Sequence, residues 1–581
     1  TSDVWTFKTR AGGTTGKSIK RYDSSGDFKG EYDKLSEAVA EAGHGDRIEV
    51  DGGTTLNNET QQVTISGTEV TIRSSDPNNP FTIDMGGGRS APGSKRENSR
   101  VFHITNGASV TIRDAIIKGG DATDATPYGG GGIRITGGST VTTINATITD
   151  NTADYGGGVY VDEGCAFNAF DTTIASNTAT KGTGGGVDVY LGTFNANNVI
   201  IRKNQAKGGV GIVDSRDVSQ MKLVGGDAAA VLDGAFNAVG RSIRESGERA
   251  GTIGNGGGVA VRWEGSIFNA TETTIMENTA EGSIEANGGG VLLWRSTFNA
   301  YSGTAITGNR AESEEKAYGG GVVVDYGGTF NAYEGAKITE NRAEGPEPKG
   351  GGVAVLTGTF NAYEGTEITD NRADGFYASG GGVAVLKNGG TFNATDTTIA
   401  SNTVYGQQTD GGGGVFVSRN GSFIASNADI KLNRATGPFD WNGQGGGVAV
   451  RGGTFEAKDE TSISSNTARY GGGVSVEYDR VAEEAAVPGT FNAESVTISG
   501  NDATKDGGGI WWVAADKISG EILGKITTNG NDWSPQADQQ DNFSVDTNGS
   551  ISTPADTGHP VQVLDNTAGT EGCRQMKVRK P

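Results

Sequence analysis

Apolar and polar residues alternate in short segments that recur along the middle of the chain. Residues 380–385 (Gly-Gly-Gly-Val-Ala-Val) form the first segment, in which the Val-x-Val alternation is typical of a half-buried strand. Residues 391–394 (Thr-Phe-Asn-Ala) form the second, with Phe and Ala on one side and Thr and Asn on the other. An isoleucine followed three places later by an asparagine, as in Ile399 and Asn402, forms the third. The pattern predicts three short strands in each repeat of about 30 residues.

The phenylalanine and the asparagine of the repeat form two columns. Successive Phe residues from Phe236 to Phe455 are 30 to 32 residues apart, and a fixed period in this range is typical of repeat proteins. The Phe column is Phe167, Phe194, Phe236, Phe268, Phe298, Phe330, Phe360, Phe392, Phe423, Phe455 and Phe491. The Asn column is Asn151, Asn177, Asn204, Asn278, Asn309, Asn341, Asn371, Asn402, Asn433, Asn466 and Asn501.

Three strands per repeat, glycine-rich punctuation and no apolar stripe of helical period predict an all-β parallel β-helix, a β-solenoid with three sheets and about 15 coils. Coils ~4.8 Å apart place like residues on one another, so we expect Phe and Val to stack in the core. The Asn column would share amide hydrogen bonds at a bend. Glycine supplies 98 of the 581 residues, which we attribute to tight turns that need a positive φ.

The repeat divides the chain into four regions. Residues 1–34 form an N-terminal segment, 35–100 contain a short amphipathic helix at 35–42 and the first coils, 101–532 contain the repeats, and 533–581 form a C-terminal cap and polar tail. We expect the helix to cover the open first coil, whose strand edges would otherwise be exposed. Trp511, Trp512 and Trp533 are candidates to close the other end. Insertions at 214–231 and 478–488 are expected to be surface loops, with a binding role as the alternative.

Two stretches resemble known β-helix families. Residues 35–50, followed by Gly52-Gly53-Thr54, look like the start of pectate-lyase-like right-handed β-helices. Ile368, Asn371 and Ala373, followed by residues 380–383, resemble the repeat of chlamydial polymorphic outer-membrane proteins, with Ile in place of that family's Phe and Gly in place of its Ala. The resemblance, which covers about residues 110–510, implies a right-handed β-helix that is displayed on a cell surface and acts in adhesion or assembly.

Composition favours an extracellular protein. The sequence has no apolar stretch of ~18 or more residues, so we predict no membrane-spanning helix. A formal net charge of −22 disfavours nucleic acid as a partner. The chain starts at Thr1 without Met, which we interpret as a processed, secreted form. Sequons make seven asparagines candidate glycosylation sites: Asn58, Asn145, Asn269, Asn393, Asn420, Asn542 and Asn548.

Residues suited to catalysis do not converge in the sequence. The three histidines, His44, His103 and His559, are far apart along the predicted rod. Acidic residues such as Glu312 and Glu344 are spread over loops, as is usual for solvated surface charge. We therefore predict that the protein is not an enzyme, does not cleave pectin or alginate, and needs no cofactor. Ca²⁺ stays open as an alternative, because polysaccharide lyases of the resembled fold bind it through clustered carboxylates.

An inward Phe column implies an outward, flat face of Thr and Asn with a regular rise of ~4.8 Å. Such a face could match a glycan chain, a crystal face such as ice, or a neighbouring rod. The alternative is that Thr simply favours strands and Asn stacks well. The predicted face contains Thr297, Asn299, Thr329, Asn331, Thr359, Asn361, Thr391 and Asn393. Loop aromatics are a second candidate for stacking on sugars, or else pack the loops onto the body: Tyr318, Phe376, Tyr377, Tyr405, Phe439 and Trp441.

The C-terminal tail is the candidate for assembly. Cys573 has only Cys165 as a partner within the chain, and a disulfide needs Cα atoms within ~7 Å. The tail could run back along its own rod or reach the next subunit in a head-to-tail polymer, and the alternative is a disordered tail with an unpaired Cys573. Val561 and Val563 alternate with other residues and could add a strand to an exposed edge.

These features predict a secreted structural protein of the cell surface, a filament subunit or adhesin, whose partners are itself or surface glycans. The alternative is a carbohydrate-binding or polysaccharide-degrading β-helix protein.

Overall fold

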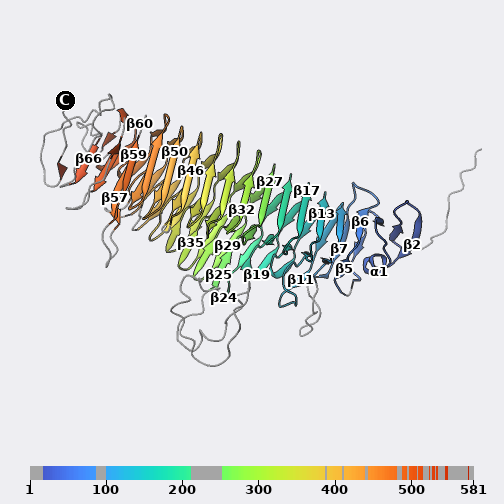
Figure 1. Cartoon of the computed structure of the whole chain (residues 1–581). Coiled ribbons are helices and arrows are strands. Elements are labelled where there is room, and N and C mark those ends of the chain that lie inside the picture. The colour runs from blue at the N-terminus through green and yellow to red at the C-terminus, as the bar shows by residue number, and fades with distance from the viewer. Residues whose placement is uncertain are drawn as a thin grey trace, which may run out of the picture.

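The protein is an elongated rod of stacked coils (Figure 1). The computed structural model describes residues 17–59, 61–86, 100–210, 252–386, 389–407, 411–438, 443–479, 487–493, 496–506 and 508–513, together with short strands between 522 and 574. It is 56% strand and 2% helix, and its parallel sheets complete about 12 turns. Further strands at the two ends bring one sheet to 15 strands. The predicted all-β parallel β-helix is confirmed.

Each coil contains four strands. In one coil these are β45 (Val383–Val385), β46 (Thr391–Thr395), β47 (Thr398–Ala400) and β48 (Thr403–Gly406). They pair in parallel with β49 (Val415–Val417), β50 (Ser422–Ser426), β51 (Asp429–Lys431) and β52 (Arg434–Thr436) of the next coil. Repetition gives four parallel sheets, which we call the Val, Phe, Ile and Ala sheets after a buried residue typical of each.

The Ala sheet makes the prediction of three sheets wrong. Its strands directly follow the Asn column, as β44 (Arg372–Gly375) follows Asn371, and in β44 only Ala373 is fully buried. One small apolar residue among charged neighbours shows no alternation that could be recognised in the sequence.

The Phe sheet runs along the whole rod. Its parallel strands are β3 (Asp46–Val50), β6 (Glu69–Ser74), β9 (Ser109–Arg113), β13 (Thr140–Ile144), β17 (Ala166–Phe170), β21 (Thr193–Asn197), β27 (Ile267–Thr271), β32 (Thr297–Ala300), β37 (Thr329–Ala332), β42 (Thr359–Ala362), β46, β50, β54 (Thr454–Lys458), β59 (Thr490–Ala493) and β63 (Ile522–Leu523).

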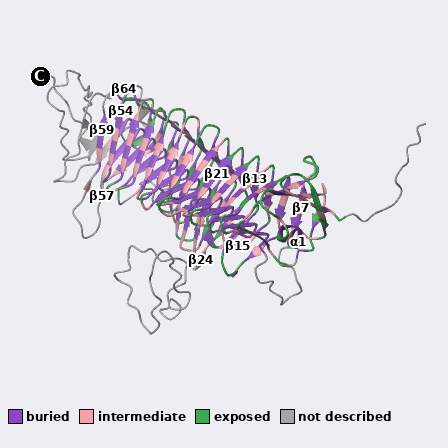
Figure 2. Ribbon diagram, turned by 45° about the vertical axis from the view of Figure 1, so that its right-hand side comes forward, coloured by how far each residue is buried: buried purple, intermediate pink, exposed green. Residues whose placement is uncertain are grey.

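The Phe column forms a continuous stack in the core. Its members from Phe167 to Phe491 are fully buried, and successive ring centroids lie between 4.3 Å (Phe268 to Phe298) and 5.3 Å (Phe360 to Phe392) apart. Figure 2 shows the buried residues running along the rod and the exposed ones gathered at the turns. The predicted inward position of the column is confirmed for the described residues.

Between Phe194 and Phe268 the structure has one coil fewer than the sequence pattern predicts. Phe194 stacks directly on Phe268 at 4.7 Å, and β21 pairs with β27. One coil therefore spans the sequence from Phe194 to Phe268, and a period of the sequence pattern was wrongly counted as a coil. Phe236 and the predicted insertion at 214–231 lie outside the described residues.

The Asn column lies at the bend between the Ile and Ala sheets and shares amide hydrogen bonds as predicted. The Asn371 side chain donates from Nδ2 to Asn402 Oδ1 (3.0 Å) and to the Ile338 carbonyl (2.8 Å), and its backbone N–H also donates to Asn402 Oδ1 (3.0 Å). Asp370, just before it, has a φ of 58°. The column is buried from Asn151 to Asn501, so it ties each coil to the next inside the rod.

The glycine triplet has two physical causes rather than the one that we predicted. Gly380 has a φ of +65°, which agrees with the predicted turn. A Cβ on Gly381 would lie 2.4 Å from the Gly413 carbonyl oxygen, and one on Gly382 would lie 2.7 Å from that of Gly414. The second and third positions therefore require glycine because the backbones of adjacent coils approach closely.

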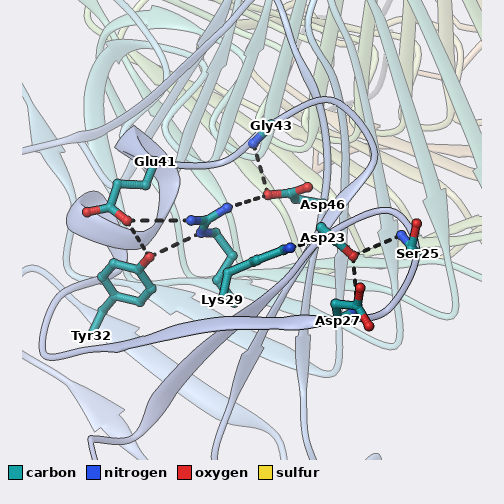
Figure 3. Close-up of polar contacts among 9 residues, drawn as sticks. Asp23, Ser25, Asp27, Lys29, Tyr32, Glu41, Gly43 and Asp46 are labelled. Atoms are coloured by element: carbon teal, nitrogen blue, oxygen red, sulfur yellow. Dashed lines mark hydrogen bonds and ion pairs between the residues drawn. The ribbon is translucent and has the colours of Figure 1, made fainter.

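At the N-terminal end, a hairpin and the helix adjoin the first coil. The hairpin consists of β1 (Ile19–Tyr22) and β2 (Phe28–Tyr32), and α1 (Leu35–Ala40) follows with Leu35 and Ala38 buried. Figure 3 shows the polar network that joins them, in which Arg21 donates to Asp46 (2.8 Å) and Tyr32 donates to Glu41 (2.6 Å). The helix is thus present at the predicted place, and its role as a cap stays a prediction.

At the C-terminal end, β62 (Ile510–Val513) pairs in parallel with β66 (Phe543–Asp546), which pairs antiparallel with β67 (Cys573–Arg574). The Trp511 ring lies 4.8 Å from that of Tyr470. The side chains of Trp512 and Trp533 lie outside the described part of the chain, so their predicted role in closing this end is not addressed. Of the insertion at 478–488, residues 480–486 also lie outside the description.

Candidate binding face

The outer surface of the Phe sheet carries parallel ranks of uncharged polar side chains. In β32, Thr297 and Asn299 are half-buried and alternate with the buried Phe298 and Ala300. The same pattern holds in β37 and β42, so the ranks continue through Thr329, Asn331, Thr359 and Asn361. The predicted Thr and Asn positions are therefore brought together on one face.

The outer asparagines form a second amide ladder. Asn331 Nδ2 donates to Asn299 Oδ1 (2.9 Å), and Asn361 Nδ2 donates to Asn331 Oδ1 (2.9 Å). The ladder contains Asn168, Asn195, Asn269, Asn299, Asn331, Asn361 and Asn393. An amide has two N–H donors and an oxygen with two lone pairs, and the ladder uses one of each. Each asparagine within the ladder therefore retains a donor and an acceptor for a ligand, repeated once per coil.

A tyrosine column borders the ladder on one side. Tyr301, Tyr333 and Tyr363 follow the Thr-Phe-Asn-Ala phrase in three successive coils, and their rings stack at 5.1 and 5.2 Å with interplanar angles of 7° and 5°. Tyr301 is 40% exposed and Tyr363 is 39% exposed. Because the rings cover each other's faces, they present edges and hydroxyl groups rather than open faces. Burial, followed by Tyr363 and Tyr301, raises the pKa of Tyr333, so its hydroxyl stays a donor at neutral pH.

A second aromatic column borders the face on the other side. Trp263, Trp294 and Tyr326 lie at the ends of Val-sheet strands, where the chain turns into the Phe sheet. Their centroids are 6.1 and 4.6 Å apart, and the Arg295 guanidinium lies 5.8 Å from the Trp263 ring. Neither column was predicted from the sequence. The first column could have been predicted, because Tyr follows Thr-Phe-Asn-Ala in three coils. The second column shows no such signal in the sequence, because the Val-sheet strands beside it differ in composition.

We call the Thr and Asn ranks of β32, β37 and β42, together with the two aromatic columns, the candidate binding face. These ranks contain no charged residue, although the chain carries a formal charge of −22.

The loop aromatics do not form one surface. Tyr318 packs against the cluster that contains Leu292 and Val323. Phe376 and Tyr377 contact each other at 4.7 Å and are 37% and 41% exposed. Tyr405 lies on the Ala sheet, with the Arg372 guanidinium 5.7 Å from its ring. Phe439 and Trp441 lie outside the described residues.

The two described histidines lie on different elements, His44 between α1 and β3 and His103 in β8 (Phe102–Thr105). His44 pairs with Glu69 (3.4 Å) near the first coil, and His103 Nε2 lies 3.2 Å from Thr136 Oγ1. Glu312 and Glu344 belong to an exposed ionic ladder with Arg310 and Arg342 on the Ala sheet. Within the described residues, no group of three or more His, Cys, Asp or Glu residues could hold a metal ion. His559 lies outside them.

The candidate glycosylation sites differ in accessibility. Asn58 and Asn420 are exposed, and so is Asn145, whose amide donates to Asp114 (2.8 Å). Asn269 and Asn393 belong to the outer ladder, which a glycan on either residue would interrupt. Asn542 and Asn548 lie outside the described residues.

The predicted assembly residues are not brought together. Cys165 is a free thiol, 2% exposed, in the turn before β17, and burial raises its pKa. Cys573 is in β67, which pairs with β66 at the C-terminal end of the rod, many coils from β17 (Figure 1), so a disulfide within the chain is not formed. Val561 and Val563 lie outside the described residues.

Comparison with known proteins gives no family: no family model matches the chain, and no curated protein matches it. The resemblances to pectate-lyase-like and chlamydial proteins therefore stay interpretations of the motifs quoted above. Among the described residues, no helix is long and apolar enough to cross a membrane.

Proposed function

We propose that this protein is a secreted structural rod that acts as an adhesin, and that the candidate binding face holds a neutral, repetitive glycan. The observation that carries the proposal is the outer Asn ladder between two aromatic columns. It offers one free donor and one free acceptor per coil, beside the Thr and Tyr hydroxyls. A glycan presents hydroxyl groups at a regular interval, and the Tyr spacing of 5.1 to 5.2 Å is close to the length of one sugar residue in an extended chain.

The absence of charge in the ranks of β32, β37 and β42 supports a neutral ligand. An acidic polysaccharide would be repelled by a chain of charge −22, and these ranks contain no cation to offset the repulsion. Partly exposed tyrosines are common in binding surfaces because each offers an apolar body and a polar tip. The Ala sheet is less suited to a ligand, because its Arg and acidic side chains already pair with one another.

Filament formation, the other predicted role, receives less support. β67 pairs with β66 of its own chain, so residues 573–574 are used within the monomer rather than offered to a neighbour. The structure contains one chain, and self-assembly through the tail stays a prediction.

The proposal is tested by binding of the full chain to an array of neutral and acidic glycans, with electron microscopy of the same sample to detect filaments. We expect binding to a neutral polymer without its cleavage. Tyr333→Ala and Asn331→Ala should each weaken binding about tenfold, since each removes a hydrogen-bonding group worth about 1.5 kcal/mol.

Thr339→Ala is the matched control. Thr339 is a half-buried, outward residue of β38 (Lys337–Thr339) in the Ile sheet, and its hydroxyl donates to Thr307 (3.0 Å). This variant removes a comparable polar group from a different face of the same coil and should bind normally. Equal loss in all three variants, or binding to acidic glycans alone, would contradict the proposal.

A further inference from the structure

The outer surface of the Val sheet is unusual near the N-terminal end, because it carries a row of polar side chains of which the first is half-buried and the others are buried. His103, Arg134, Tyr160 and Asp188 occupy equivalent positions on β8 (Phe102–Thr105), β12 (Ile133–Ile135), β16 (Val159–Val161) and β20 (Val187–Tyr190). In later coils the same positions hold apolar residues such as Leu292, Val323 and Ala354. Arg100, just before β8, is also fully buried.

Two arginines in this row lack partners for most of their donors. Arg100 donates from Nη2 to the Pro127 carbonyl, and its Nε and Nη1 have no hydrogen-bond partner. Arg134 has a 7% exposed side chain and reaches Asp162 from Nη2 at 3.3 Å, and its Nε and Nη1 are also without a partner. Among the described residues, no carboxylate pairs with Arg100.

A third arginine of the same surface shows how such a side chain is normally satisfied. Arg262 donates to both carboxylate oxygens of the buried Asp188, from Nε at 2.9 Å and from Nη2 at 2.7 Å. A guanidinium stays charged in proteins, so burial without a partner costs several kcal/mol per ion. The four nitrogen atoms of Arg100 and Arg134 that lack a hydrogen-bond partner are therefore more consistent with a bound ligand than with a core whose polar groups are all satisfied.

The pKa shifts of Arg100 and His103 also indicate a positively charged site. Burial, followed by the charge of Arg134, lowers the pKa of Arg100 to about 9, well below the ordinary value of a guanidinium. Burial, followed by Arg100 and Arg134, lowers the pKa of His103 to about 4. The charged groups in contact with the pair include one acid, Asp162, so the local charge is positive.

We propose that Arg100 and Arg134 form a binding site for one small oxyanion, a sulfate or a carboxylate, carried either as a free ion or on an acidic sugar. Guanidinium groups bind such anions through paired N–H donors. Tyr128 lies at the solvent side of the site, since it is 41% exposed and its ring lies 5.9 Å from the Arg134 guanidinium. The site is on the Val sheet, so it is separate from the candidate binding face and does not depend on its function.

The test is thermal unfolding of the full chain in increasing sodium sulfate, compared with sodium chloride at equal ionic strength. We expect a saturable rise in the unfolding temperature with sulfate and none with chloride. The rise with sulfate should be lost in Arg100→Met. A saturable rise with glucuronate but not glucose would identify an acidic sugar as the source of the anion, and a rise with sulfate alone would identify a free ion.

Arg342→Met, in the exposed ladder of the Ala sheet, is the control and should respond as the native chain does. Sulfate also stabilises proteins generally, so an equal response in the native chain and in Arg100→Met would overturn the proposal. If Arg100→Met does not fold, Arg134→Lys tests the site instead, because lysine keeps the positive charge but lacks the paired N–H donors of the planar guanidinium. It should need several-fold more sulfate for the same rise, and an unchanged sulfate dependence would overturn the proposal.

Discussion

At the residue scale, the repeat works through stacking of identical side chains. Phe360 is fully buried between Phe330 at 4.7 Å and Phe392 at 5.3 Å, so its removal leaves a cavity in a continuous stack. Phe360→Ala should lower the free energy of unfolding by about 3–5 kcal/mol. Chemical denaturation measures the change, with Tyr363→Ala on the surface of the same coil as the control, for which we expect no more than about 1 kcal/mol. A similar cost for both variants would contradict the stacked core.

His103 predicts a pH dependence of stability. Its pKa is lowered from 6.5 to about 4, first by burial and then by Arg100 and Arg134. Between pH 6.5 and pH 4, His103 is therefore protonated in the unfolded chain and neutral in the folded chain. The stabilisation is therefore complete above about pH 6.5 and is lost as the pH falls toward 4, by on the order of 3 kcal/mol. His103→Gln removes the titrating group, so the difference between the two proteins should vary over this window. A constant difference would show that His103 is not held neutral.

Residues in a column could be predicted from the sequence, whereas isolated ones could not. The position of Phe360 follows from a pattern that the ten phenylalanines of the described stack share, and the Asn column follows for the same reason. Arg100 belongs to no column, and it donates to the Pro127 carbonyl, 27 residues away. The Tyr column was not predicted, because Tyr301, Tyr333 and Tyr363 lie just beyond the ends of the alternating strands.

At the element scale, the glycine triplet fixes how closely two coils approach. A Cβ at Gly381 would meet backbone atoms of Gly413 and Thr403 within 2.4 to 2.5 Å, and backbone cannot move aside as a flexible side chain can. Gly381→Ala should therefore lower the free energy of unfolding by about 3 kcal/mol or more. Gly335→Ala is the control: it has a φ of +73° but nothing within 4 Å, so backbone strain alone should cost about 1–2 kcal/mol. The two are compared by denaturation, and an equal cost would mean that φ, not close approach, explains the triplet.

Strands with several or large buried apolar residues could be predicted from the sequence, and strands with one small apolar residue could not. The Val and Phe sheets each place two inward apolar residues in most strands, and the Ile sheet places a large one, so their alternation is visible. An Ala-sheet strand such as Arg342–Glu344 (β39) places one buried alanine between charged residues. Its position is fixed by the preceding Asn column and by pairing with neighbouring coils, which are tertiary effects.

At the scale of the whole molecule, the sheets of the rod differ in the side chains that they carry on their outer surfaces. The Phe sheet presents uncharged ranks, the Ala sheet presents an ionic ladder, and the first coils of the Val sheet bury a positively charged row. The sequence predicted the rod and the outward Thr and Asn, because both follow from the period. It did not predict the neighbouring aromatic columns, because they depend on how one sheet turns into the next.

The most direct test of the proposed adhesive function is the affinity of the full chain for neutral glucan, xylan and mannan oligomers of graded length. A face that repeats once per coil offers the same hydrogen bonds to each added sugar, so affinity for the preferred oligomer should rise with length until the glycan spans the ranks. Asn331→Ala, which interrupts the ladder at the middle rank of the candidate binding face, should flatten this rise, whereas Thr339→Ala should leave it unchanged. An affinity that does not depend on length, or no binding to any neutral oligomer, would contradict the role that we assign to the face.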